Sequence, residues 1–249
     1  MSGHSKWSSI KHKKGAADKA RGKLFGKLIR QVEVAAREGG GDPDANPTLR
    51  TMYQKARDAS VPLDTIERAI KRGTGELEGV TYEQGSYEGY APNGVAVYVE
   101  VLTDNRNRAG GQIRGLFTKH GGTLAEPGAV AWQFERKGVV ILPRSVTEDD
   151  LMVAVLDAGA ENLTDEGDTW RVSCEPGDLT EVREALAGAG IGFDTADVTM
   201  VPTTTVELAT AAEAKPVLRL LDELDDHDDV QGVYANFDVP DDVLQTVAS

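Results

Sequence analysis

The residues whose types most clearly indicate a chemistry lie between positions 3 and 30. This segment holds nine Lys and Arg side chains and one acid, Asp18. Clustered cations neutralise phosphate groups, so the segment predicts contact with nucleic acid or another anionic surface. The alternative is a basic terminus that is only solvated. The residues expected to contact nucleic acid are His4, Lys6, Trp7, Lys11, His12, Lys13, Lys14, Lys19, Arg21, Lys23, Lys27 and Arg30.

The charge of the remaining chain has the opposite sign. Residues 1–72 hold sixteen Lys and Arg against eight Asp and Glu, a net charge of +8. Residues 73–249 hold 11 against 33, a net charge of −22, so the formal total of −14 conceals a cationic module on an anionic body. Such segregation is typical of proteins that bind polyanions with one region only.

Trp7 is the one large aromatic side chain in the basic segment before residue 22. Its ring could stack on an unpaired base, or it could pack against the helices that follow. His4 and His12 lack Cys or carboxylate neighbours at the spacing of a zinc site, so phosphate contact is the better interpretation.

A second polar group lies in the stretch TDNRNRAGGQIRG, residues 103–115. The pattern places it where a strand ends and a helix begins, and the free N–H groups of a helix N-terminus attract anions. A secondary anion site here would use Asn105, Arg106, Asn107, Arg108 and Arg114. An equally supported alternative is that an Asn only caps the helix and that the arginines pair with acidic side chains.

Motifs for catalysis are missing from the sequence. The glycine runs at 73–79 and 188–192 follow predicted helices, whereas a dinucleotide site needs them to follow a strand. There is no phosphate-binding loop, esterase elbow or zinc-protease motif. We therefore predict no enzyme activity, no cofactor and no metal. His227 lies in an acidic run, LLDELDDHDDV, that we interpret as a solvated surface, and Cys174 is interpreted as strand packing.

Helices are predicted to position the basic residues. Apolar residues recur at helical spacing from Leu24 to Ala36, and the helix should end at Gly39-Gly40-Gly41. Asn46 before Pro47 predicts the start of a second helix. A third should start after Ser60 and Pro62, bury Leu63, Ile66 and Ile70, and end at Gly73. Residues before 22 contain too few apolar side chains to join this bundle, so we expect them to form a mobile arm.

The acidic region predicts a mixed α+β fold. Two alternating segments joined at Pro92-Asn93-Gly94 read as a hairpin, followed by a helix at 107–120 and a strand in VAWQFER, residues 130–136. From Val139 to Val201 the predicted order is β-α-β-β-α-β, a complete ferredoxin-like unit. The C-terminal residues supply the strands and helix that the earlier unit lacks.

We therefore predict three domains in an α+β protein. These are a basic arm and helical bundle at 1–79, a ferredoxin-like α+β domain at 80–136 plus 202–249, and a second ferredoxin-like domain inserted at 137–201. Sequential domains are the alternative, but they would leave half a sheet unpaired. No apolar run reaches the ~20 residues that span a bilayer, and no secretory signal is seen, so we expect a cytoplasmic protein that does not enter a membrane.

Several motifs, taken in order, resemble the YebC family. They are GHSKW with IKHKK, GGGDPDANPTLR, IERAIKRGTGE, YEGYAPNGVAVYVEVLTDNRNR and KHGGTL, all within residues 3–138. The resemblance implies a three-domain cytosolic protein of a family long labelled as DNA-binding transcriptional regulators. Some family members resemble ribosome-associated factors that assist translation of proline-rich stretches.

Three functions follow from these patterns. The family resemblance favours a DNA-binding regulator of transcription. The composition of the arm favours RNA or the ribosome, because no predicted helix groups the Asn, Gln and Arg residues that read base edges. A protein-binding adaptor that uses the acidic sheets is the third. The sequence leaves the oligomeric state open.

Overall fold

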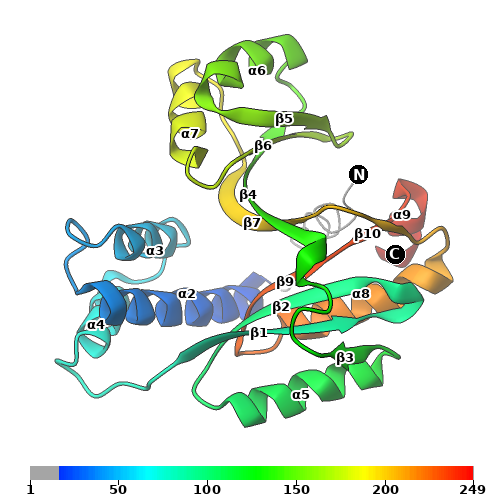
Figure 1. The fold of residues 1–249 in the computed structure, drawn as a ribbon. Helices are drawn as coiled ribbons and strands as arrows, with labels where there is room; N and C mark the ends of the chain where they lie inside the picture. The colour runs from blue at the N-terminus through cyan, green and yellow to red at the C-terminus, as the bar shows by residue number, and fades with distance from the viewer. Residues whose placement is uncertain (1–16, 249) are drawn as a thin grey trace. The chain divides into compact units, whose positions relative to one another are not determined.

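The basic helical region consists of three helices. In the computed structural model, which describes residues 17–248, these are α2 (Ala17–Gly39), α3 (Pro47–Asp58) and α4 (Leu63–Gly73) (Figure 1). Asn46 caps α3 as predicted, because its Oδ1 accepts a hydrogen bond of 3.0 Å from the Leu49 N–H. The prediction that residues before 22 stay outside the bundle as a mobile arm lies, for residues 1–16, outside the described part of the chain.

Two details of the helical prediction were wrong. Helix α2 begins at Ala17, earlier than Leu24, because the sequence ADKARGK consists mainly of good helix formers. Leu63 is 42% exposed rather than buried, since α4 starts at this residue and its first turn lies at the rim of the bundle. Ile66 is buried as expected.

The bundle is closed by an apolar core and one buried carboxylate. Leu28, Val32, Leu49 and Ile66 belong to the core. Glu33 is only 3% exposed, and its two oxygens lie 3.3 Å from Arg37 Nη2 and 2.9 Å from Arg72 Nε. Because Arg72 belongs to α4, this carboxylate fastens α4 to α2.

The first of the two four-stranded sheets has the strand order β3-β1-β2-β9 and is antiparallel throughout. Its strands are β1 (Glu83–Tyr90), β2 (Ala96–Thr103), β3 (Thr123–Ala125) and β9 (Val230–Ala235). The predicted hairpin is confirmed: β1 pairs with β2, and the 3₁₀ turn η1 (Pro92–Gly94) joins them, with Asn93 at φ 64°.

Helices α5 (Arg106–Lys119) and α8 (Ala211–Asp225) cover one face of this sheet (Figure 1). Phe117 of α5, Leu218 of α8 and Val99 of β2 share one buried core. The C-terminal part adds a short parallel pair, β8 (Val206–Glu207) with β10 (Phe237–Asp238), and α9 (Asp241–Ala248). These elements and the three-helix bundle form one compact unit. It consists of two segments of the chain, one that ends at Ala131 and one that begins at Val206.

Residues Trp132–Thr205 form the other compact unit. Its element order is β4 (Phe134–Pro143), α6 (Glu148–Val155), η3 (Leu156–Ala158), β5 (Ala160–Asp165), β6 (Thr169–Cys174), α7 (Leu179–Gly188) and β7 (Thr195–Pro202). The sheet order is β5-β6-β4-β7, and both helices cover one face. The buried Cys174 lies in β6, where burial raises the pKa of its thiol, so the prediction of strand packing is confirmed.

The strand predicted at residues 130–136 is confirmed for residues 134–136 and was wrong for residues 130–133. Ala131–Gln133 form a 3₁₀ turn, η2, and a single strand, β4, runs from Phe134 through the segment predicted to begin a new domain. The pairing of β4 with β7, from Phe134↔Pro202 to Ile141↔Thr195, determines where this strand begins. Pairing within the sheet, and not the local sequence pattern, therefore determines the start of β4.

The mixed α+β class is confirmed by these two units and their helices. Of the helices that the structure describes, none combines the length and the apolar character needed to cross a membrane.

Candidate nucleic-acid interface

The described part of the predicted interface is helix α2. His4, Lys6, Trp7, Lys11, His12, Lys13 and Lys14 lie outside the described residues. Lys19 and Arg21 belong to α2, and Arg21 is exposed. Lys23, Lys27 and Arg30 follow at spacings of four and three residues, which places their side chains on one face of the helix.

This face of α2 contacts the end of α8 and the turn that follows it. Lys23 Nζ lies 2.9 Å from Asp226 Oδ2 and donates to the Asp226 carbonyl at 3.0 Å. Lys27 Nζ lies 3.0 Å from Asp225 Oδ1 and donates to the Asp225 carbonyl at 2.9 Å. Because the last carbonyls of a helix carry a partial negative charge, both lysines also stabilise the C-terminus of α8.

Arg30 contacts the centre of the turn. Its Nη1 donates to the Asp228 carbonyl and lies 3.3 Å from Asp229 Oδ1. Asp229 is 4% exposed, and its other oxygen, Oδ2, accepts from Arg108 Nη2 at 2.7 Å and from Thr103 Oγ1 at 2.9 Å. We name the residues 225–229 the acidic turn.

The electrostatics of Asp229 follow from these partners. Burial opposes its charged form, but the hydrogen bonds from Arg108 and Thr103, and the charges of Arg108 and Arg30, outweigh burial and lower the pKa of Asp229. The hydrogen bonds to Asp229 and Asp104 in turn raise the pKa of Arg108. The prediction that this acidic run is a solvated surface was therefore wrong for Asp229, which is buried and pairs with two arginines.

Two of the five residues of the predicted secondary anion site, Asn105 and Arg108, form contacts within the chain. Asn105 caps α5 by accepting from the Arg108 N–H at 3.0 Å, and Arg108 Nη2 also contacts Asp104 Oδ1 at 2.7 Å. This is the alternative of capping and pairing that the sequence left open. Arg106, Asn107 and Arg114 are exposed. Anion binding by these three residues stays a prediction.

His227 lies inside the acidic turn. Its Nε2 is 2.9 Å from Gln112 Oε1, and its Nδ1 accepts from the Asp229 N–H at 3.1 Å. Burial lowers the pKa of this imidazole despite the nearby carboxylates. Within residues 17–248, no group of three His, Cys, Asp or Glu side chains is arranged to hold a metal ion.

Glu88 is another buried carboxylate that sequence reasoning missed. Its oxygens accept from the N–H groups of Gly128, Val130 and Ala131 at 2.7, 2.7 and 2.8 Å. Burial opposes the charge, but these three hydrogen bonds outweigh it and lower the pKa of Glu88. Glu88 thus fixes the loop that follows β3. A lone Glu in a strand with alternating pattern gives no signal for this role.

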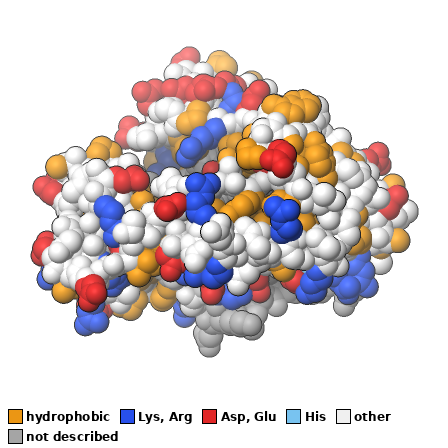
Figure 2. Space-filling view, turned by 60° about the horizontal axis from the view of Figure 1, so that its bottom comes forward, with side chains coloured by type: hydrophobic (Ala, Val, Ile, Leu, Met, Phe, Trp, Pro, Cys, Tyr) orange, Lys and Arg blue, Asp and Glu red, His pale blue; other side chains and the backbone are white. Residues whose placement is uncertain are grey.

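The partners of α2 were also missed, although a signal exists. Cations at positions 23, 27 and 30 and acids at positions 225, 226 and 229 are both clustered, and the two clusters are of opposite sign. Figure 2 shows one face of the molecule, on which Lys and Arg side chains lie in small groups among acidic and hydrophobic ones.

Together the helical module with its basic face and the two α+β sheets define a multidomain protein of mixed architecture. Residues 5–76 match the N-terminal domain of TACO1/YebC proteins, and residues 82–237 match the second and third domain. The chain belongs to the TACO1/YebC family, which confirms the resemblance noted from its motifs.

Relatives cover the full chain. A protein of Rubrobacter xylanophilus is 57% identical over 250 residues, with 100% of both chains covered, and one of Mycolicibacterium smegmatis is 56% identical over 245 residues, covering 98% of this chain and 97% of its own. Both are named probable transcriptional regulatory protein. The crystal structure of a conserved hypothetical protein from Aquifex aeolicus is similar, with 45% identity, a TM-score of 0.80 and coverage of 90% and 93%.

Proposed function

We propose that this protein is a non-enzymatic regulator of gene expression that binds nucleic acid through its basic N-terminal module. The observation that carries the proposal is the segregation of charge: +8 in residues 1–72 against −22 in the remainder. The names of the relatives support a regulatory role. The binding residues are those of the arm together with Lys19, Arg21, Lys23 and Lys27 of α2.

The contacts of α2 divide its three paired cations into two groups. Lys23 and Lys27 pair with Asp226 and Asp225, whose side chains are 59% and 46% exposed. The lysine side chains are 27% and 15% exposed, so each pair is open to water mainly on its carboxylate side. Such partly exposed pairs contribute little to stability, so a phosphate group can replace either carboxylate at a modest cost. Arg30 pairs with Asp229, and removal of Arg30 would leave a buried charge with fewer partners. In this proposal the lysines exchange partners, whereas Arg30 stays on the acidic turn.

A second observation favours RNA over duplex DNA. The segment from 3 to 16 carries Trp7 among Lys, His, Ser and Gly residues. An indole ring stacks on bases only where they are unpaired, and basic segments of this composition follow an irregular phosphate surface well. This second candidate is a translation factor that binds ribosomal RNA.

The test compares affinities of the full chain for a structured ribosomal RNA fragment and for duplex DNA at one salt concentration. RNA should bind more tightly, and Trp7→Ala should weaken RNA binding by about 1 to 3 kcal/mol while changing duplex binding little. Tighter duplex binding with no effect of Trp7→Ala on RNA would favour the transcriptional candidate. Absence of binding to both would contradict the proposal itself and favour an adaptor.

A further inference from the structure

Helix α6 is apolar on two opposite sides. Leu151 and Val155 are buried against the sheet of residues 132–205. Met152 and Val153 of α6, and Leu156 at the start of η3, are 44%, 84% and 65% exposed. Surface helices normally present polar side chains to water, and a helix that is apolar all round is normally buried. The outer side of α6 therefore has the composition of a covered surface.

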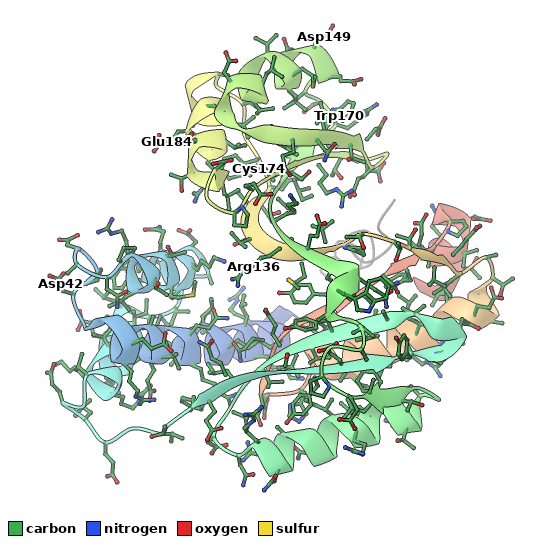
Figure 3. All side chains as sticks on the ribbon, in the orientation of Figure 1. Asp42, Arg136, Asp149, Trp170, Cys174 and Glu184 are labelled. Carbon is green, nitrogen blue, oxygen red and sulfur yellow. The ribbon has the colours of Figure 1, made fainter. Side chains whose placement is uncertain are left out.

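Acidic side chains surround these three residues. Glu148, Asp149 and Asp157 are exposed, and none of them forms an ion pair with another described residue. Figure 3 shows Asp149 on the side of α6 that points away from the sheet. Residues 132–205 contain fifteen Asp and Glu against five Lys and Arg. This field repels phosphate groups and also repels the same face of a second copy.

We propose that the outer face of α6, formed by Met152, Val153 and Leu156 with the rim of Asp149 and Asp157, docks a Lys- and Arg-rich amphipathic segment of a partner protein. Apolar side chains of the segment cover the three exposed residues, which supplies affinity. Its cations pair with the rim carboxylates, which supplies orientation and a fast encounter rate. The partner needs both apolar side chains and cations, because an uncharged apolar segment would leave the rim carboxylates unpaired.

A defined probe tests this chemistry on the full chain. The probe is a fluorescent helical peptide with leucines on one face and lysines beside them, and its counterpart carries glutamates in place of the lysines. Wild type should bind the lysine peptide and not the glutamate peptide. The double variants Val153→Ser with Leu156→Ser, and Asp149→Asn with Asp157→Asn, should each weaken binding at least tenfold.

The matched control is Val80→Ser, which changes a residue that is 45% exposed in the other unit and should bind the lysine peptide as wild type does. All variants should keep the wild-type melting temperature, because the changed side chains face water. Equal binding of both peptides, or equal loss in the control, would overturn the proposal.

A photo-crosslinking residue placed at position 153 then identifies the natural occupant in cells. Crosslinked peptides rich in Lys and Arg would support the proposal. Crosslinks to nucleic acid, to acidic segments, or to a second copy whose dimer dissociates in the Val153→Ser, Leu156→Ser variant would overturn it. The same residue placed at position 80 serves as the control.

Discussion

Helices α2 and α6 both carry clustered charge, but only one of them has its partners within the chain. Lys23, Lys27 and Arg30 of α2 contact Asp226, Asp225 and Asp229 at 2.9 to 3.3 Å. In the part of the chain that the structure describes, Asp149 and Asp157 of the α6 face have no such ion-pair partner. The comparison teaches that a charged cluster indicates an external ligand most directly where the chain itself does not neutralise it.

Asp229 is the residue on which the internal pairing of α2 depends most. Replacement by Ala should lower the free energy of unfolding by about 2 to 4 kcal/mol, because it leaves Arg30 and Arg108 without their shared carboxylate and Thr103 without its acceptor. Thermal or urea unfolding measures the effect.

The control for this change is Asp228→Asn, which alters the charge equally at an exposed neighbour whose contact to Arg30 uses only the backbone carbonyl. It should change stability by less than about 0.5 kcal/mol. Equal effects of the two variants would mean that α2 is not fastened through Asp229.

The next largest loss of stability is expected at Glu88, a carboxylate that takes no part in the proposed binding of phosphate. Glu88→Gln should lower the free energy of unfolding by about 1 to 3 kcal/mol. An amide oxygen accepts hydrogen bonds from the three N–H groups more weakly than a carboxylate does. Urea unfolding at neutral pH should detect the loss.

The contribution of Glu88 to stability should decrease as the pH falls into the acid range. Since the pKa of Glu88 is lowered in the folded protein, its contribution is complete above the pKa of an unfolded glutamate, about 4.3, and is lost as pH falls through the lowered folded value. Glu88→Gln should therefore flatten the decline of stability in acid. An unchanged decline would show that the three hydrogen bonds do not depend on the charge.

The smallest effect on stability is expected for the exposed acids of the turn. Asp225→Asn with Asp226→Asn should change the free energy of unfolding by less than about 1 kcal/mol, since ion pairs whose carboxylates are exposed to water contribute little. The same change removes the carboxylate partners of Lys23 and Lys27 and should tighten nucleic-acid binding severalfold.

Asp149→Asn with Asp157→Asn is the matched control, because it removes the same charge from α6. If the two double variants tighten nucleic-acid binding equally, the effect comes from net charge alone. That result would contradict the proposal that phosphate replaces the carboxylates at α2.

Local rules predicted the elements that local contacts determine. The cap at Asn46, the hairpin turn at Asn93 and the alternation of β6 around Cys174 each depend on a few neighbouring residues. The start of β4 depends on its pairing with β7, about sixty residues away, and VAWQFER gives no sign of it. The acidic turn and α2 are separated by about 200 residues, so spacing predicted the cationic face and not the carboxylates that meet it.

The central claim is that the basic module binds nucleic acid by neutralising phosphate groups, and the salt dependence of binding tests it most directly. If roughly six phosphates are contacted, affinity should fall on the order of a thousandfold between about 50 and 200 mM salt. Replacing Lys11, Lys13, Lys14, Lys23 and Lys27 with Ala should weaken binding and flatten the slope of log affinity against log salt. A slope identical to that of wild type would contradict the assignment of the interface to this module.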